Sequence, residues 1–508
     1  MGAMKPAIVL RFFEQFYLTT VVLSDTDTVW LRDPSDFLKD EPIADLFIST
    51  DCLSHEAEER ALRGEAVKVS RCGHLPGVVK DQLALNTGII AFRNRAATKK
   101  FLQRWRSYLL DPAKARHIAS SGANWTVTDQ LALNLLMQEG TDRIVRGVRE
   151  AGRLVWLADR TVKVLPLPVL AAVNGHVAFE QHLAERHAVS PYVVHATFNR
   201  FGLVGKRMRF REMGWWLVDA DHYTSTDRNI MTYDNNVAAF IQGLEEAEGH
   251  MVLLKKHLLG AAYQVAALRD ALAIAWHLNR TLVLPQFLAW CDHDHNADVL
   301  GRCATVGSDL QLPFKCPADF YINMRTLPSS ELLVRESSFL DKVSTDLFAT
   351  RQAVTLLDWQ TASTEAKPAV AADDTRLLRI GIQAEKLQAV LGWDSDAGIL
   401  DWRGFQPGAF GGSADPVKTQ QFNRLFKAIT HGLQWCCSGG SWEIPHQFQA
   451  SRWLYVQPPP LEVRSAGAAP IPWQVPKLRR PAVCDQLEGE NVKFFSIYEN
   501  HPCRFLPA

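Results

Sequence analysis

One segment limits the possible folds more than any other: the apolar run Val21-Val22-Leu23, followed by Ser24 and the motif Asp25-Thr26-Asp27. Two threonines precede this β-branched run, so the sequence predicts a buried strand over 19–23. The carboxylates then lie at the carboxyl end of a strand, which is the ligand-binding edge of open α/β sheets. Two carboxylates this close repel each other unless a cation lies between them, and hard oxygen ligands suit Mg²⁺ or Mn²⁺. The segment therefore predicts an α/β domain with a metal site.

Strands and helices alternate along the first 225 residues, which argues for an α/β layered domain. The polar, glycine-punctuated stretch 55–82 is expected to be a long loop. The remaining expected elements are strands at 44–49, 85–92, 162–167 and 192–195 and helices at 4–17, 96–110 and 128–138.

The composition changes after residue 225 and indicates a second α/β region. A strongly helical stretch at 253–278 leads into an apolar strand at 281–285. An Ala/Thr/Asp-rich stretch near 362–375 is typical of a linker. The predicted organisation is a first domain over 1–225, a helix-rich α/β region over 226–361, the linker 362–375 and a C-terminal region over 376–508 to which the sequence assigns no role.

Composition excludes several classes of protein. The 508 residues carry 55 Lys+Arg and 55 Asp+Glu, so the chain is neither a basic nucleic-acid coat nor an acidic tail, and we expect no nucleic-acid partner. Nine cysteines are too few for a disulfide scaffold.

We expect no signal peptide, because the first ten residues lead straight into domain-like sequence. We expect no membrane anchor either, because the run Val164–Phe179 is too short to span a bilayer and is broken by prolines.

Two enzyme classes place an Asp-x-Asp motif after a strand. In haloacid-dehalogenase phosphatases the first aspartate attacks phosphorus, and in GT-A glycosyltransferases the pair holds a divalent ion on a nucleotide-sugar diphosphate. The motif alone fits both classes. A phosphatase also needs an acidic pair after a later strand, but the adjacent pair Asp373-Asp374 lies in the linker-like stretch. A transferase needs a small turn for the sugar, an acid or amide near the anomeric carbon, and a late histidine and lysine. The chain offers these in order: Asn86-Thr87-Gly88, Asp129-Gln130, His195 and Gly205-Lys206.

With these motifs, the chain resembles glycosyltransferase family 77, the nucleotide-diphospho-sugar transferases of plants and green algae. Within that family it is most similar to the extensin arabinosyltransferases. The resemblance covers roughly residues 1–320. It is carried by Ser24–Pro34, Asn86-Thr87-Gly88, Asp129-Gln130 and Val194–Thr197, by Met4-Lys5-Pro6 at the start of the chain, and in the second half by 268–275 and 278–285.

The resemblance implies a GT-A-type fold, with a mixed sheet between helices, and a role for each motif residue. Asp25 would face the ribose and the metal, Asp27 would bind the metal directly, and His195 would complete the Mn²⁺ (or Mg²⁺) site. Gly205 would let the backbone approach the diphosphate, which Lys206 would neutralise. Further roles are implied for two motifs: Asn86, Thr87 and Gly88 would shape the sugar pocket, and Asp129 and Gln130 would lie near the reacting carbon.

The implied reaction is retaining transfer of a sugar, arabinose or another pentose, from a UDP-sugar to a cell-wall glycoprotein or glycan. No covalent nucleophile stands out, so we expect a same-face route through an ion pair, with Asp129 as the one carboxylate nominated as nucleophile or stabiliser. Because the chain begins about one helix before the motif, the first strand of the GT-A sheet is expected to be missing. Two alternatives therefore stay open: a truncated, inactive binding module, and an aspartyl phosphatase.

The resemblance also implies a location in the Golgi lumen, where disulfides form. Among Cys291, Cys303 and Cys316 we expect one disulfide, with one cysteine left over.

Overall fold

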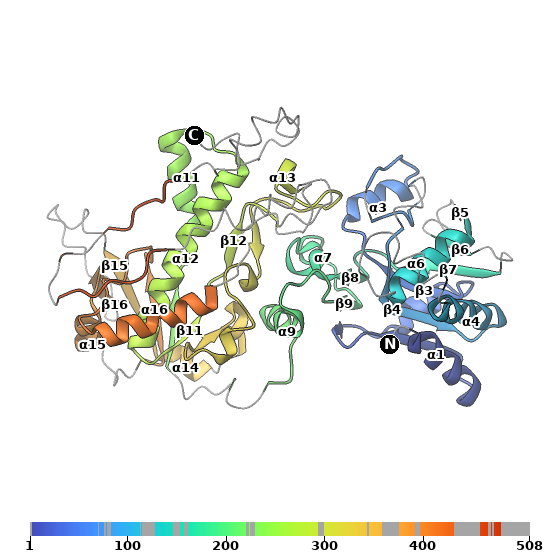
Figure 1. Cartoon of the computed structure of the whole chain (residues 1–508), viewed down its shortest axis with the longest axis horizontal. Coiled ribbons are helices and arrows are strands. Elements are labelled where there is room, and N and C mark those ends of the chain that lie inside the picture. The colour runs from blue at the N-terminus through green and yellow to red at the C-terminus, as the bar shows by residue number, and fades with distance from the viewer. Residues whose placement is uncertain are drawn as a thin grey trace. The chain divides into compact units, whose positions relative to one another are not determined.

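The computed structural model divides into two compact units (Figure 1). The first comprises Met1–Phe198 and Val306–Leu310, and the second comprises Asn199–Thr305 and Gln311–Ala508. The structure describes residues 3–430 except 70, 76–77, 79–82, 112, 114–127, 146–152, 157–160, 220–222, 224–228, 293–298, 343–344, 358–374 and 392–396, and beyond 430 it describes 458–465, 469 and 472–478.

A six-stranded mixed sheet forms the centre of the first unit, in the order β1-β4-β3-β7-β6-β5. Only β3 and β7 pair in parallel; the other neighbours are antiparallel. The edge strand β1 is half-buried along its length, because it has one partner strand, whereas the sequence predicted a buried strand. The strands are β1 (Thr20–Ser24), β3 (Leu46–Thr50), β4 (Leu85–Arg93), β5 (Thr141–Val145), β6 (Arg153–Trp156) and β7 (Val162–Pro166).

Three helices pack into one core on this sheet: α1 (Met4–Gln15), α4 (Ala96–Leu110) and α6 (Asp129–Gly140). The predicted inward residues of α4, namely Phe101, Leu102 and Trp105, have no exposed surface. Thr128 Oγ1 accepts a hydrogen bond from Leu131 N at 3.1 Å and so caps the start of α6. These helices therefore form where the apolar spacing predicted them.

The second core of the first unit contains the remaining elements. A three-stranded sheet has the order β2-β9-β8, and its residues pack with Phe47, Ile89 and Ala91 of the large sheet. The elements are β2 (Thr28–Trp30), α2 (Ser35–Asp40), β8 (Ala172–Asn174), α7 (Gly175–Phe179), α8 (Leu183–Arg186) and β9 (Val193–His195).

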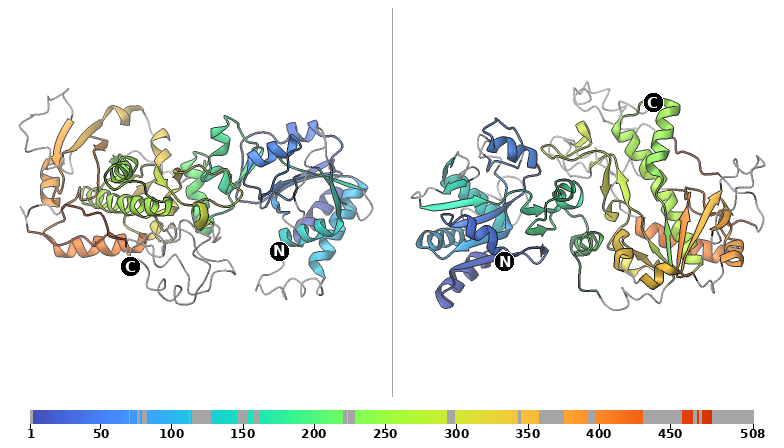
Figure 2. Two further views of the ribbon diagram at one scale, coloured as in Figure 1. Left: turned by 90° about the horizontal axis from the view of Figure 1, so that it is seen from above. Right: turned by 180° about the vertical axis from the view of Figure 1, so that it is seen from behind.

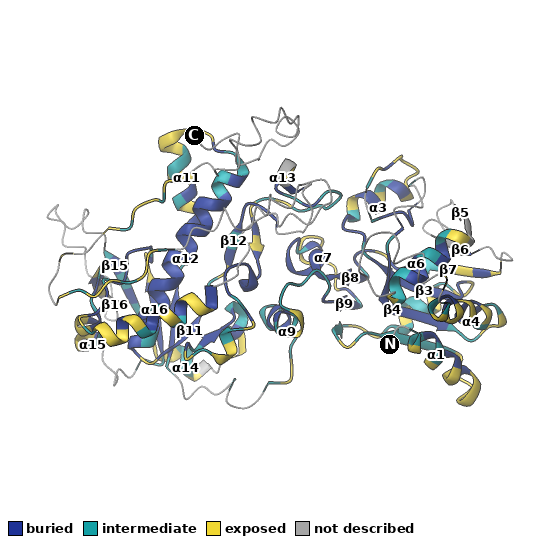
Figure 3. Cartoon of the chain, in the orientation of Figure 1, coloured by how far each residue is buried: buried dark blue, intermediate teal, exposed yellow. Residues whose placement is uncertain are grey.

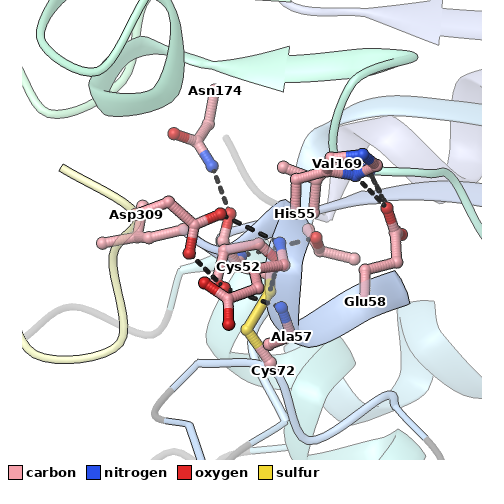
Figure 4. The surroundings of a disulfide bond; sticks show 12 residues. Cys52, His55, Ala57, Glu58, Cys72, Val169, Asn174 and Asp309 are labelled. Carbon is pink, nitrogen blue, oxygen red and sulfur yellow. Dashed lines mark hydrogen bonds and ion pairs between the residues drawn. A yellow bond between two sulfur atoms is a disulfide. The ribbon is translucent and has the colours of Figure 1, made fainter. Parts of the chain in front are cut away.

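The region expected to be a long loop contains α3 (His55–Leu62), so that prediction was wrong. Ser54 caps the helix, since its Oγ accepts from Ala57 N at 2.9 Å. A disulfide between Cys52 and Cys72 joins the residues before and after this helix, and Asn174 donates to the Cys52 carbonyl at 2.8 Å (Figure 4). The sequence had not indicated this disulfide.

The second unit is built on a parallel sheet in the order β14-β11-β10-β17-β15-β16 (Figure 2). Two of its strands come from the region predicted to form a separate C-terminal part, so residues 375–403 share one sheet with 230–357. The strands are β10 (Ile230–Tyr233), β11 (Thr281–Val283), β14 (Val334–Arg335), β15 (Arg351–Leu357), β16 (Thr375–Arg379) and β17 (Ile399–Arg403).

Helix α12 (Leu253–His277) is the core helix of the second unit, and Figure 3 shows it buried along its length. Among the described residues it is the one helix long and apolar enough to span a membrane, but every residue of its apolar window is buried inside the protein. This burial is what a core helix of a globular unit requires. The unit's other helices are α9 (Gly202–Glu212), α11 (Val237–Glu248), α13 (Val299–Arg302), α14 (Thr345–Ala349), α15 (Ala384–Leu391) and α16 (Pro416–Thr430), with an antiparallel pair β12 (Phe287–Ala289) and β13 (Phe314–Cys316).

The compact units divide at 198/199, whereas the predicted boundary lay at 225. Helix α9 packs in the second unit because its buried Arg209 pairs with the buried Asp319, with N–O distances of 2.9 and 3.1 Å. Cys291 and Cys303 form a disulfide and leave the buried Cys316 outside it, which agrees with the one disulfide that the family resemblance implied among these three cysteines. The predicted linker lies outside the described residues, apart from Thr375.

Candidate functional site

The turn between β1 and β2 carries Asp25 and Asp27. Thr28 Oγ1 donates to the Asp25 carbonyl at 2.8 Å, and the Trp30 indole N–H donates to Ser24 Oγ at 3.2 Å. These bonds hold the turn tightly, so the two half-buried aspartate side chains keep a fixed spacing at the carboxyl end of β1.

Strand β9 brings His195 to this turn. Thr28 pairs with His195 in the antiparallel register of β2 and β9, and Ala196 N donates to the Asp27 carbonyl at 3.0 Å. The ligand atoms of Asp25, Asp27 and His195 all lie within 4.8 Å of one another, and His195 Nε2 is 3.3 Å from Asp27 Oδ1. Two carboxylates and one imidazole at this spacing suit Mn²⁺, which accepts both oxygen and nitrogen ligands.

A bulge in β4 brings the Asn86-Thr87-Gly88 turn to the same place. The β3–β4 register jumps from Ile48 opposite Ile90 to Ser49 opposite Asn86. The Ser49 hydroxyl spans the bulge, lying 3.0 Å from the Asn86 carbonyl. The extra residues are thereby pushed out of the ladder, which is what a bulge does beside many active sites.

Gly88 is required by the close approach of two elements. Its carbonyl accepts from Asp25 N at 2.8 Å, which joins the bulge to the aspartate turn. A Cβ added at Gly88 would lie 2.1 Å from His195 Cε1 and 2.5 Å from His195 Nδ1. The imidazole of His195 therefore packs directly on Gly88, and it can occupy this position only because glycine has no side chain.

Lys5, on the first turn of α1, connects Asp25 of the aspartate turn to Asp129 of α6. Its Nζ lies 2.8 Å from Asp25 Oδ1, 2.7 Å from Asp129 Oδ2 and 3.1 Å from the Thr87 carbonyl. These three partners match the three donors of an ammonium group. Burial alone would lower the pKa of Lys5, but the hydrogen bonds and charges of Asp129 and Asp25 raise it.

Asp129 starts α6 and is held as a carboxylate. Its Oδ2 also accepts from Thr87 Oγ1 at 2.9 Å. Burial would raise its pKa, but the hydrogen bond and charge of Lys5, together with Thr87, bring the pKa below its ordinary value. The site therefore presents an ionised, half-buried carboxylate beside the bulge.

Asp51, directly after β3, orients the two amide side chains of the site. It accepts from Asn86 Nδ2 at 2.8 Å and from Gln130 Nε2 at 2.9 Å. The Asn86 oxygen in turn accepts from Gly88 N at 2.8 Å. Burial raises the pKa of Asp51, although these amides and the nearby Arg71 and His195 oppose the rise. This network fixes the orientation of the Asn86 and Gln130 amide groups at the bulge.

The fold thus brings eight predicted site residues together in the first unit: Asp25, Asp27, Asn86, Thr87, Gly88, Asp129, Gln130 and His195. Gly205 and Lys206 lie on α9 in the second unit. There a Cβ at Gly205 would lie 2.8 Å from Asn199 Oδ1, so the local need for glycine is the packing of that side chain. The phosphate roles of these two residues stay predictions.

Sequence reasoning missed Lys5 and Asp51. Asp51 carried a usable signal, because it follows an apolar strand in the same way as Asp25. Lys5 entered only through the likeness of Met4-Lys5-Pro6 to the family, without a role, because it is the packing of α1 beside β1 and α4 that brings its side chain to the site.

Residues 1–210 match the family model described as nucleotide-diphospho-sugar transferase. Over 441 residues the chain is 28% identical to Arabinosyltransferase XEG113 of Arabidopsis thaliana, in an alignment that covers 82% of this chain and 60% of that protein. The chain therefore spans about 60% of the length of this curated relative. No solved structure matches the chain.

Proposed function

Because its first 210 residues match the family model of nucleotide-diphospho-sugar transferases, we propose that this chain is a metal-dependent, retaining glycosyltransferase that uses a UDP-sugar. This match and the 28% identity to an arabinosyltransferase support the resemblance to glycosyltransferase family 77. The observation that carries the proposal is the meeting of Asp25, Asp27 and His195 within 4.8 Å, next to the Asn86–Gly88 bulge and an ionised Asp129. Family membership also argues against the aspartyl phosphatase.

In this mechanism Asp25, Asp27 and His195 would hold Mn²⁺. When bound, the metal offsets the negative charge that builds on the departing diphosphate. Asp27 and His195 already lie 3.3 Å apart, and Gly88 leaves room for the imidazole, so the three ligands need little rearrangement. A preorganised site of this kind pays little reorganisation cost in the transition state.

The sugar would lie against the bulge, where Asp129 faces the positive charge that develops at the anomeric carbon. Lys5 keeps this carboxylate ionised and fixed at 2.7 Å, and Thr87 fixes the same oxygen. Gln130 and Asn86, both anchored on Asp51, would bind sugar hydroxyls. A carboxylate that stabilises an ion pair without forming a bond agrees with transfer on the same face of the sugar.

The donor sugar we propose is arabinose or another pentose, and the acceptor a cell-wall glycoprotein or glycan. The support is the 28% identity to an arabinosyltransferase over most of this chain. We propose the Golgi lumen as the location, because the two disulfides, Cys52–Cys72 and Cys291–Cys303, require an oxidising compartment.

The test is release of UDP from a panel of donors: UDP-arabinofuranose, UDP-arabinopyranose, UDP-xylose, UDP-galactose and UDP-glucose. Each is incubated with the purified chain and a hydroxyproline-arabinoside peptide, with and without Mn²⁺. We expect Mn²⁺-dependent release from one donor and its loss in Asp27→Ala. If the folded protein releases no UDP from any donor, the proposal is refuted and the inactive binding module is favoured.

A further inference from the structure

The second unit contains a pocket of about 400 Å³ that the transfer reaction does not use. Its lining includes Ala262 and Arg269 of α12 and the glycine-rich segment Gly408–Gly412 after β17, which we call the floor. The rest of the lining comes from the segments Pro458–Arg464 and Pro472–Pro476, which we call the proline strap.

The first segment of the proline strap is anchored to the rest of the unit at Pro459, Leu461 and Val463. Asn423 of α16 makes two hydrogen bonds to the backbone of Leu461, at 2.8 and 2.9 Å. Val463 forms a parallel bridge with Ser413, and Arg269 donates to the Pro459 carbonyl at 2.6 Å. The pocket therefore has a built wall and is more than a gap beneath a loose segment.

The floor is held closely enough that only glycine fits. A Cβ at Gly411 would lie 2.2 Å from the Gly381 carbonyl oxygen, and one at Gly412 would lie 2.8 Å from that of Glu462. The fully buried Asp270 fixes the start of this segment by accepting from Gly408 N at 2.6 Å. The pocket also lies beside the carboxyl ends of two parallel strands, because Ile382, just after β16, bridges to Phe410. Ligands of parallel α/β sheets bind at that edge.

The lining combines an aromatic ring with charged groups of both signs. Trp473 is fixed by edge contacts with Phe240 and Tyr263, at centroid distances of 5.6 and 5.8 Å. Arg269, Arg464 and Glu462 supply donors and acceptors. Stacking on an aromatic face with charged side chains around the rim is the chemistry that recognises a sugar ring, whose C–H face is apolar and whose edge carries hydroxyls.

Two features disfavour a phosphate group in this pocket. Glu462 places a carboxylate in the lining. The helix that follows the glycine-rich segment, α16, has its first amides already capped, because Asp415 Oδ1 accepts from Val417 N at 2.9 Å and from Lys418 N at 3.1 Å. The usual anion site at a helix N-terminus is thus closed.

We propose that this pocket is a saccharide-binding site that takes a neutral sugar unit of a glycan chain. The site goes beyond the proposed transfer reaction, because binding needs neither nucleotide nor metal. It would give the second unit a function of its own, namely holding a glycan.

The test is calorimetric titration of the full chain, without metal or nucleotide, using arabino-, xylo-, galacto- and cello-oligosaccharides, with saturation-transfer NMR to identify the bound unit. We expect saturable binding by one series. It should weaken at least tenfold in Trp473→Leu and Arg464→Gln, and remain unchanged in Arg379→Gln, a control at an exposed arginine on β16.

Asp27→Ala separates this proposal from the proposed function, because it should abolish transfer and leave saccharide binding intact. Arg464→Gln keeps the test falsifiable if Trp473→Leu fails to fold, since Arg464 is only half-buried and glutamine keeps a polar side chain there. The proposal is overturned if no oligosaccharide binds the folded chain, if Arg464→Gln binds as tightly as the unchanged protein, or if UDP or GDP binds in an Arg464-dependent way instead.

Discussion

The substitution Gly88→Ala tests the site most directly, because it adds one methyl group where the imidazole of His195 packs. The added carbon would lie 2.1 Å from His195 Cε1, whereas ordinary van der Waals contact begins at 3.4 Å. The ring must therefore move by more than about 1 Å, and a displacement of that size costs about 100-fold in rate when it misplaces a group of the active site. Because His195 is a proposed metal ligand, Mn²⁺ affinity should fall by roughly 10–100-fold as well.

Two measurements check this expectation: the Mn²⁺ dependence of UDP release, and the rise in melting temperature that Mn²⁺ produces. Gly88→Ala should need more Mn²⁺ for both. The matched control is Gly243→Ala on α11, where a Cβ meets nothing within 4 Å and the helix should gain about 0.5–1 kcal/mol. If Gly88→Ala binds Mn²⁺ as tightly as the unchanged chain and keeps its rate, His195 is not a ligand and our reasoning fails.

Three further outcomes follow from the structure. Lys5→Met should lower kcat about 100-fold. It should also move the acid limb of the pH–rate profile to higher pH, because Lys5 lowers the pKa of Asp129. Lys5→Arg should restore part of the rate, and an unchanged pH–rate profile in Lys5→Met would contradict the proposed effect of Lys5 on Asp129. The double variant Cys52→Ala, Cys72→Ala opens a loop with a sequence separation of 20 and should lose about 3 kcal/mol of unfolding free energy in denaturant titration. Burial raises the pKa of Glu212 to about 8. The stability that its protonated form contributes is therefore complete below pH ~4.5 and is lost as the pH rises toward 8. Glu212→Gln should reduce this fall of the melting temperature with pH, and an equal fall in both proteins would refute the expectation.

Much of the first unit could be predicted because its signals are local. The apolar spacing of 96–110 identified the buried face of α4, and Thr128 marked the start of α6. Helix α3 was missed because its buried positions are two small residues, Ala57 and Ala61, and the charged Glu58, which together give a weak apolar pattern. Its end signals, Ser54 before and Gly64 after, were nevertheless present.

The site was predictable in its residue types and less so in its connections. Asp25, Asp27 and His195 carry chemistry that stands out in a sequence, and the fold brings them together. The contact between Gly88 and His195 depends on a bulge whose register no local pattern specifies. The boundary between the two units at 198/199 could not be predicted from local sequence either, because it depends on the buried pair of Arg209 and Asp319, which lie 110 positions apart.

The charge balance of the site explains why its parts depend on one another. Asp25 and Asp129 come from different elements and would repel each other, but Lys5 lies between them and offsets one negative charge. Asp27 is close to the imidazole of His195, which offsets little unless it is protonated. One ammonium group cannot offset the carboxylates of Asp25, Asp27 and Asp129, and two of these three lie on the aspartate turn. Under the proposed function a divalent cation at the turn would complete the balance, and Asp129 would stay ionised on the other side of Lys5, where we propose that a positively charged sugar forms.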